Sequence, residues 1–507
     1  MTTTFIPTDQ KRDSSSCPLQ QEPVKKTGTG TVFTFPNTPQ HPPHAPTDIP
    51  PINNRKSKIE NRKSHLPLLA RFIDGAYWNI IGAIFPQALT LAAAIIVARI
   101  LGKASFGAAG VLQSTILAAV SIAAIGLEHT ISKHVAQLRD SNRPRLARIL
   151  GTASLLTLLS SILIAMLAFT SSSFLASRLL DAPSLATDLR LACCVIILNT
   201  LIIVPSSTLV GLERFRSLAK INMLRAALAL ALLIAGAHYA GLRGWLIATL
   251  CVSAAELAIK YLVARRQLRR LSIRPRLHLH PAELSAMLRF ALPIFAASLV
   301  GPPVVWVANA LLVHQPDGFA QMGIFNAAQQ WMTVATLIPT LLAAVILSIL
   351  SNVQDSAHPD RIRRVRRTVL ASVAAIAAAI SLALFLAAPW IIPVYGRDYS
   401  DCLPVVYILL LTAFLTSLSV AAKMILISMA RHSVMLFASL LSAAVLLLIM
   451  FLTRHHGAPA RALALLISEF IYLATITAWV LLRPNPPLVS DPQTLLHKTL
   501  PDPTPQP

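Results

Sequence analysis

Twelve long apolar stretches follow one another through this sequence, and they restrict its folding more than any other feature. They lie near residues 76–100, 108–127, 149–170, 190–211, 222–241, 244–263, 290–313, 323–350, 368–395, 402–428, 433–453 and 462–482. A helix needs about 20 mostly apolar residues to cross the roughly 30 Å of hydrocarbon in a bilayer. The chain is therefore expected to be an all-α polytopic membrane protein with about twelve transmembrane helices.

Composition agrees with a membrane location. Charged residues make up only 13% of the 507 residues, whereas a soluble domain has about 25%. The net charge of +23 would suggest a nucleic-acid partner if it formed a patch on a soluble domain. Here the basic residues lie in short gaps between apolar stretches, so we expect no nucleic-acid partner. The five cysteines form no CxxC pair, and we expect no disulfide framework, metal site or cofactor.

The basic residues also predict the orientation of the chain. They are concentrated in alternate gaps, above all in two clusters: Arg265, Arg266, Arg269, Arg270, Arg274 and Arg276, then Arg361, Arg363, Arg364, Arg366 and Arg367. The opposite gaps hold Lys103, Arg178, Arg190, Arg243, Arg397, Arg454 and Arg461. Because cytoplasmic loops carry the excess of Lys and Arg, we expect both termini in the cytoplasm. The loop between the first two apolar stretches, which we call the Gly102 loop, is then expected outside.

Composition shifts divide the chain into five segments. Residues 1–70 are rich in Pro, Thr, Ser, Asn and Lys and lack the apolar core of a signal peptide. They predict a disordered cytoplasmic tail, which is either genuine or the result of a mis-assigned start codon. A six-helix bundle is expected over 71–264, a basic cytoplasmic linker over 265–288 and a second six-helix bundle over 289–483. Residues 484–507 predict another disordered cytoplasmic tail.

An internal repeat supports two equivalent bundles. A shift of 216 positions places Gly318 and Gly323 of GFAQMG on Gly102 and Gly107 of GKASFG. Because six helices return the chain to its starting side, both bundles face the same way. Such parallel halves are related by a pseudo-two-fold axis along the membrane normal, with the substrate path between them.

Several segments are familiar. The first half contains GAYWNIIG from Gly75, VARILGKASFG from Val97 and GLEHTISKHVA from Gly126. The second half contains RFALPIF from Arg289, WVANALLV from Trp306, GIFNAAQQW from Gly323 and VYGRDYS from Val394. Over about residues 70–482 the chain resembles bacterial oligosaccharide flippases of the multidrug, oligosaccharidyl-lipid and polysaccharide exporter superfamily.

The resemblance implies two lobes around a V-shaped cavity in the bacterial inner membrane. It also implies alternating access, by which undecaprenyl-pyrophosphate-linked oligosaccharide passes from the cytoplasmic to the outer leaflet. The product would be O-antigen lipopolysaccharide, capsule or exopolysaccharide. The implied partners are this lipid-linked oligosaccharide, membrane lipids and other polysaccharide assembly proteins.

Other functions stay open. A drug exporter and a lipid II flippase belong to the same superfamily. A membrane-embedded glycosyltransferase or polymerase handles similar lipids but usually needs a sizeable external domain with acidic or basic catalytic groups. The longest external gap here has only Asp181 and Asp188 as acids. We therefore expect a transporter and not an enzyme.

The expected cargo guides the choice of candidate site residues. A diphosphate needs cations, because an uncompensated charge in hydrocarbon is costly. Candidate cations are Arg99 at the end of the first helix, Lys260 in the sixth and Lys423 in the tenth. Alternatively, Arg99 satisfies helix-end carbonyls, Lys423 snorkels to the interface, and Lys260 pairs with Glu256, four residues earlier.

Sugar contacts call for amide and aromatic side chains. The candidates lie in helices 1, 7 and 8 and are Trp78, Asn79, Trp306, Asn309, Gln329 and Gln330. The alternative role of the tryptophans is packing at the membrane interface.

Two acids and two sets of helix-breaking residues complete the candidates. Glu256 and Glu469 lie deep in predicted helices, where an acid is a candidate ion-coupling site. Glu469 has no basic residue one turn away in its own helix, so it would be protonated unless a neighbouring helix supplies a cation. The alternative is a neutral acid without a transport role.

Candidate hinges are Pro86 in the first helix and Gly301, Pro302 and Pro303 in the seventh. Breaks of this kind permit bending, although prolines are also ordinary in membrane helices.

Overall fold

A computed structural model describes the chain from Leu68 to Leu482, apart from residues 299, 355–358, 430 and 454. The described residues exclude 1–67 and 483–507, and therefore nearly all of the tail predicted over 1–70 and the whole tail predicted over 484–507, as well as the side chains of Trp78 and Asn79. The described residues form helices and no strand, which confirms the all-α prediction.

The first half forms one lobe of six spans. Its helices are α2 (Leu68–Ala123), α3 (Leu127–Leu138), α4 (Arg143–Phe174), α5 (Ala186–Gly211) and α6 (Phe215–Arg270), with the short turns η1 (Leu175–Leu179) and η2 (Pro183–Leu185). The chain reverses inside α2 at Gly102 and inside α6 at Gly241, where φ is 72° and 57°. Glycine adopts positive φ without steric cost. Each of these two helices therefore contributes two spans.

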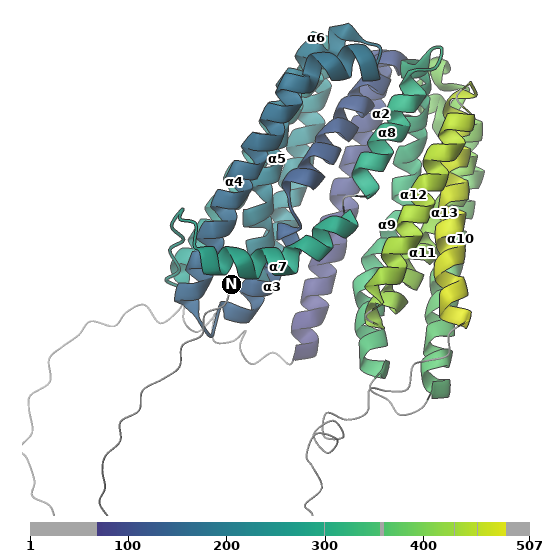
Figure 1. The fold of residues 1–507 in the computed structure, drawn as a ribbon. Coiled ribbons are helices and arrows are strands. Elements are labelled where there is room, and N and C mark those ends of the chain that lie inside the picture. Colours follow the sequence, from purple (N-terminus) through teal and green to yellow (C-terminus); the bar gives the residue numbers. More distant parts are fainter. Residues whose placement is uncertain (1–67, 299, 355–358, 430, 454, 483–507) are drawn as a thin grey trace, which may run out of the picture. The chain divides into compact units, whose positions relative to one another are not determined.

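The second half forms the other lobe. Its helices are α7 (Pro281–Ser298), α8 (Gly301–Val313), α9 (Gly318–Gln354), α10 (Pro359–Ile391), α11 (Cys402–Ser428), α12 (His432–Leu452) and α13 (Gly457–Leu482), with η3 (Ile392–Tyr395) and η4 (Arg397–Tyr399) between α10 and α11. With α7 and α8 counted as one broken span, this half also supplies six spans. The described helices thus match the twelve apolar stretches, and Figure 1 shows the two lobes side by side.

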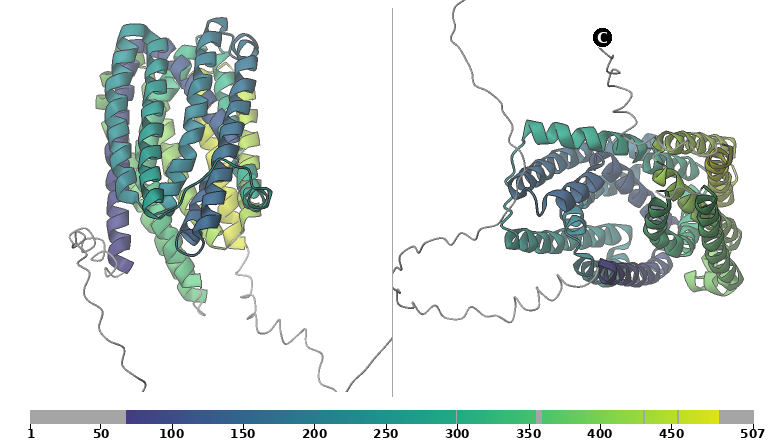
Figure 2. Two further views of the ribbon diagram at one scale, coloured as in Figure 1. Left: turned by 90° about the vertical axis from the view of Figure 1, so that its left-hand side faces the viewer. Right: turned by 90° about the horizontal axis from the view of Figure 1, so that it is seen from below.

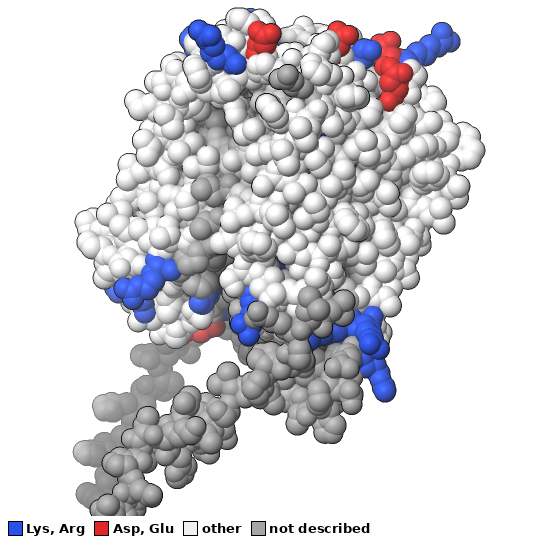
Figure 3. Space-filling model, turned by 45° about the vertical axis from the view of Figure 1, so that its right-hand side comes forward, with Lys and Arg blue, Asp and Glu red and all other residues white. Residues whose placement is uncertain are grey.

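The surface has the charge distribution of a membrane protein. Eight described helices are long and apolar enough to cross a bilayer, and two of these are the double helices α2 and α6. Charged side chains gather at the two ends, with an almost uncharged band between them (Figure 3). Large apolar side chains such as Leu163 and Met166 of α4 are exposed in this band. Apolar side chains facing outward are expected where lipid is the solvent.

The two halves of the broken span lie in different places. α8 stands upright beside α9 and α12, whereas α7 lies across the base of the first lobe (Figures 1 and 2). The prolines at 302 and 303 occupy the first turn of α8, where a missing backbone N–H costs nothing. The predicted break is therefore real, and its role as a hinge stays a prediction.

A buried acid holds α7 against α4. The side chain of Glu283 is 8% exposed and accepts bonds from Arg145 and Arg148 at 3.2 and 3.4 Å. Preceding α7, the backbone of residues 278 and 280 bonds to the hydroxyl of Thr152. The segment predicted as a linker, 265–288, thus includes the end of α6 and the start of a docked helix.

Removing both arginines should free α7. In the double variant Arg145→Gln/Arg148→Gln the buried Glu283 would lack its charge partners, which should weaken docking by about 2 kcal/mol or more. Glu283→Gln should cost less, because it leaves only half-exposed arginines unpaired. Met287 is a fully buried residue of α7, so thiol labelling of Met287→Cys reports the release. Equal labelling in the double variant and in an otherwise unchanged Met287→Cys protein would disprove the clamp.

Candidate functional site

The two lobes meet through glycines near Gly102. A Cβ atom at Gly107 of α2 would overlap the carbonyl oxygen of Phe319 in α9, and one at Gly323 would overlap that of Lys103. The repeat offset of 216 relates Lys103 to Phe319 and Gly107 to Gly323, so the two contacts are copies of each other across the pseudo-two-fold axis. We call this end of the bundle the Gly102 end.

Hydrogen bonds reinforce the contact. The indole of Trp306 donates to the hydroxyl of Thr115 at 2.8 Å, and the amide of Asn326 donates to the carbonyl of Phe106 at 3.4 Å. The phenol of Tyr399 donates to the carbonyl of Ala98 at 3.3 Å, and burial raises its pKa, so it stays a protonated donor. Trp306, predicted to touch sugar, therefore bonds the opposite lobe in this state.

Apart from α7, which docks on α3 and α4 at the other end, the second lobe meets the first mainly at the Gly102 end. Among the described residues, α2 is the only helix of the first lobe that packs extensively on α8–α13, and its bonds across the interface run from Ala98 to Thr115. The remaining helices of the two lobes diverge toward the end where α7 lies (Figure 1). The molecule is thus sealed at the Gly102 end.

A charge cluster occupies the interior of the first lobe. The ammonium of Lys260 lies 2.6 Å from one carboxylate oxygen of Glu256, and the guanidinium of Arg225 lies 3.7 Å from the other. Glu256 and Lys260 thus form the ion pair that their spacing predicted. The Arg225 side chain is 37% exposed, whereas both partners are largely buried. Two cations share one acid, so the cluster has a net positive charge and one cation that can reach an anion.

Arg225 was missed by the sequence analysis. It lies in the first span of α6 and its partner in the second, 31 positions later. A contact between two spans leaves no periodic signal in the sequence, whereas the pair at i and i+4 does.

Glu469 and Lys423 come together in the second lobe. Lys423 of α11 is close enough to Glu469 of α13 for a favourable electrostatic interaction, and Ser419 faces the same carboxyl. Glu469 is half-buried and Lys423 exposed. The neighbouring helix α11 thus places a cation within electrostatic range of the acid, although the described contacts include no ion pair between the two side chains.

The other candidates have mostly structural contacts. Asn309 is buried and bonds to Arg461, and the amide of Gln329 contacts the sulfur of Met332. Gln330 is half-buried and Arg99 is exposed beside Gly102. Pro86 is buried within the continuous first span of α2.

Comparison with known families now identifies the chain. Residues 96–404 match a family described as polysaccharide biosynthesis protein. The chain belongs to this family. The matched region includes the contact at the Gly102 end, the Arg225–Glu256–Lys260 cluster and α7, and it ends before Lys423 and Glu469.

A curated relative adds a weaker likeness. Over 142 residues the chain is 25% identical to the EPS I polysaccharide export inner membrane protein EpsE of Ralstonia solanacearum. The aligned segment covers 28% of this chain and 30% of the relative.

Solved structures share the fold over most of the chain. An inward-facing multidrug resistance transporter of the MATE family in the MOP superfamily aligns with a TM-score of 0.62 at 16% identity, covering 83% of this chain and 99% of that one. A MOP transporter from Pyrococcus furiosus aligns with a TM-score of 0.60 at 14% identity, covering 82% of this chain and 95% of that one. The eukaryotic MATE transporter AtDTX14 aligns with a TM-score of 0.61 at 13% identity, covering 82% of this chain and 96% of that one. At these identities the likeness shows the two-lobed transporter fold alone.

Proposed function

We propose that this member of the polysaccharide biosynthesis protein family is a flippase for undecaprenyl-pyrophosphate-linked oligosaccharide. It moves the head group from the cytoplasmic to the outer leaflet of the inner membrane by alternating access. The observation that carries the proposal is the pair of like-facing lobes in which, among the described helices, α2 meets α8–α13 through a symmetric contact of small residues at the Gly102 end. The polysaccharide export name of the Ralstonia relative supports this cargo and this membrane.

The Arg225–Glu256–Lys260 cluster supports an anionic head group. A diphosphate favours arginine, whose guanidinium donates several hydrogen bonds to phosphate oxygens. Lys260 lies closest to Glu256, whereas Arg225 is farther from the carboxylate and more exposed, so Arg225 is the member of the cluster that can reach a phosphate. In this proposal Arg225 binds the diphosphate and the Glu256–Lys260 pair holds the surrounding spans in place.

Closure of the lobes at the Gly102 end indicates which conformational state of the transport cycle the structure represents. If the Gly102 loop faces outward, as the distribution of basic residues predicts, the structure represents the state that receives substrate from the cytoplasm. Reorientation then requires the Gly107–Gly323 contact to separate. A membrane potential that is negative inside favours outward movement of an anion by about 2.3 kcal/mol per charge per 100 mV. The Glu469–Lys423 pair is the candidate for ion coupling, because a proton on Glu469 would end the attraction.

Reconstitution tests the proposal. The purified protein in liposomes should move a fluorescent lipid-linked oligosaccharide between leaflets, and faster when the potential favours anion exit. Protein-free liposomes are the control. A folded protein that moves no lipid-linked oligosaccharide, with or without a potential, would refute the proposal.

A drug exporter is the second candidate, because multidrug transporters share this fold. A deletion strain separates the two. Accumulation of a lipid-linked sugar intermediate on the cytoplasmic side supports the flippase, whereas drug sensitivity without such accumulation supports the exporter.

A further inference from the structure

The second lobe contains a buried arginine without a matching negative charge. Arg461 of α13 is 1% exposed. Its Nη2 atom lies 3.5 Å from the side-chain oxygen of Asn309, and its guanidinium lies 5.0 Å from the ring centre of Phe325. Its Nε and Nη1 atoms have no hydrogen-bond partner among the described residues. No carboxylate in the described part of the chain pairs with it.

This arrangement leaves a charge uncompensated. Arginine stays protonated in proteins, so it cannot become neutral to avoid the cost of burial. A neutral amide and an aromatic ring solvate the guanidinium only in part, and an unpaired buried charge costs several kcal/mol. A negative partner is therefore expected, and the described residues do not provide one.

A further unpartnered hydrogen-bond donor lies at the start of α13, the helix that carries Arg461. The side-chain oxygens of Gln315 and Gln321 accept bonds from the N–H groups of Gly457 and Ala458 at 2.7 and 2.9 Å. With its oxygen occupied, Gln315 has an Nε2 donor left over, and this atom has no partner although the residue is 7% exposed. In this state the guanidinium of Arg461 lies against Asn309 and Phe325, so it must rotate to reach the turn that Gln315 caps.

The N-terminal end of α13 also carries the positive end of that helix's dipole. Nε and Nη1 of Arg461 and Nε2 of Gln315 are thus three unpartnered donors beside the start of one helix. Three donors, one full positive charge and a positive dipole end suit an anion and disfavour a cation.

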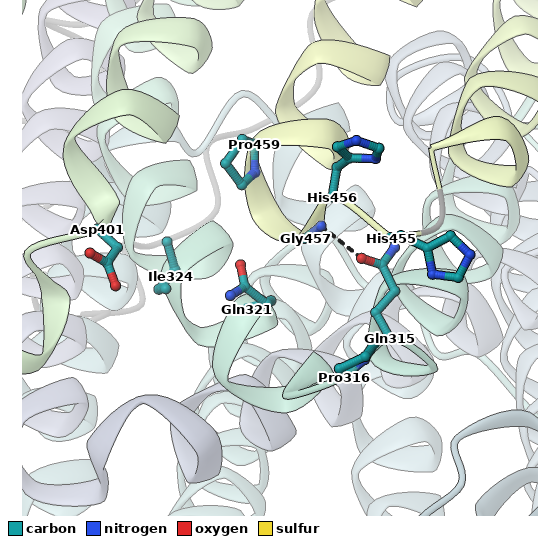
Figure 4. Close-up of a pocket in the computed structure, with 9 residues that line it drawn as sticks. All are labelled: Gln315, Pro316, Gln321, Ile324, Asp401, His455, His456, Gly457 and Pro459. Atoms are coloured by element: carbon teal, nitrogen blue, oxygen red, sulfur yellow. Dashed lines mark hydrogen bonds between the residues drawn. The ribbon is translucent and has the colours of Figure 1, made fainter.

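A pocket lies beside Gln315 and the start of α13, one helical turn from Arg461, which does not itself line it. It has a volume of about 390 Å³, and its lining includes Gln315, Gln321, Asp401 and Gly457. Figure 4 shows Gln315 beside Gly457 on one side and Asp401 on the other. An anion can therefore approach along the glutamine side, away from the carboxylate.

We propose that a small monovalent anion of the halide type binds between Arg461, Gln315 and the first turn of α13. It reaches the site through this pocket, and the long side chain of Arg461 turns toward it. The bound anion neutralises the buried charge and ties α13 to the segment that joins α8 and α9. One arginine matches a single negative charge, which is why the ligand is monovalent.

Thermal unfolding of the full-length protein in nanodiscs tests this site. At constant ionic strength, replacing gluconate by chloride or bromide should raise Tm by about 3 °C in a saturable way, as expected for a ligand that binds only the folded state. Arg461→Met should abolish the rise. It should still fold, because a hydrophobic residue of similar size often replaces a buried charge without loss. Arg397→Met, an exposed arginine at the same end, should keep the full rise.

A second measurement covers the case in which Arg461→Met does not fold. Crystals of the unchanged protein grown in bromide should show anomalous scattering beside Arg461. A Tm that does not distinguish halide from gluconate, or anomalous maps without bromide beside Arg461, would overturn the site and indicate water at the guanidinium. A halide effect that survives in Arg461→Met would overturn it too. None of these results depends on flippase activity, so this inference can fail independently of the proposed function.

Discussion

Gly107→Leu and Gly323→Leu are each expected to abolish most transport while leaving a folded, membrane-inserted protein. At both positions a side chain would collide with backbone of the opposite lobe, and backbone cannot rotate away. Forcing a large side chain into such a contact costs about 3 kcal/mol. That cost falls only on the state closed at the Gly102 end and lowers its population about a hundredfold.

Labelling and a neighbouring substitution decide whether the effect comes from the contact. Met322 is 1% exposed beside Gly323, and Met322→Cys should become reactive toward a membrane-impermeant thiol reagent in the Gly107→Leu protein. Ala104→Leu is the matched control, because Ala104 is exposed on the same turn of α2. If Gly107→Leu transports normally, the glycine contact is not a gate. If labelling appears only from the cytoplasmic side, the predicted orientation is wrong.

Arg225→Gln should reduce flipping by about tenfold to a hundredfold, which corresponds to the loss of one or two charge-assisted hydrogen bonds to phosphate. The substitution changes the cluster from net positive to neutral. The fold should persist, because the close Glu256–Lys260 pair remains and Arg225 is partly exposed. Flipping of the fluorescent lipid-linked oligosaccharide and Tm, measured on the same sample, separate the loss of activity from a loss of stability.

Two companion variants sharpen this test. Arg243→Gln removes another arginine of the first lobe that pairs with an acid, Asp188 at 3.3 Å, and it should leave flipping nearly unchanged. Arg225→Lys keeps the charge without the fork of donors and should recover part of the activity. Equal losses in Arg225→Gln and Arg243→Gln would assign the effect to general electrostatics and remove Arg225 from the pathway.

Residues close together in the chain were the ones whose partners could be predicted. The Glu256–Lys260 pair follows from a spacing of one helical turn, and the break in the seventh span follows from Gly301, Pro302 and Pro303. The glycine repeat predicted equivalent halves, and the structure adds that one glycine of each copy, Gly107 and Gly323, meets the opposite lobe.

Distant partners escaped prediction. Glu283 lies in a segment predicted as a basic linker, yet its two arginines come from α4, more than 130 positions earlier. Arg461 was assigned to a gap outside the membrane because it follows a short polar segment, whereas the structure places it inside α13 and buries it. An arginine at the edge of an apolar stretch is the same in sequence whether it faces water or a neighbouring helix.

The number of spans, the all-helical fold and the division into two like halves were thus settled by the sequence alone, because hydrocarbon demands long apolar helices wherever the chain crosses it. The tertiary structure alone decided three further features. These are the end at which the lobes are closed, the position of α7, and the identity of the buried charge that lacks a partner among the described residues. These features depend on side chains from spans far apart in the chain, and their packing leaves no periodic trace in the order of residues.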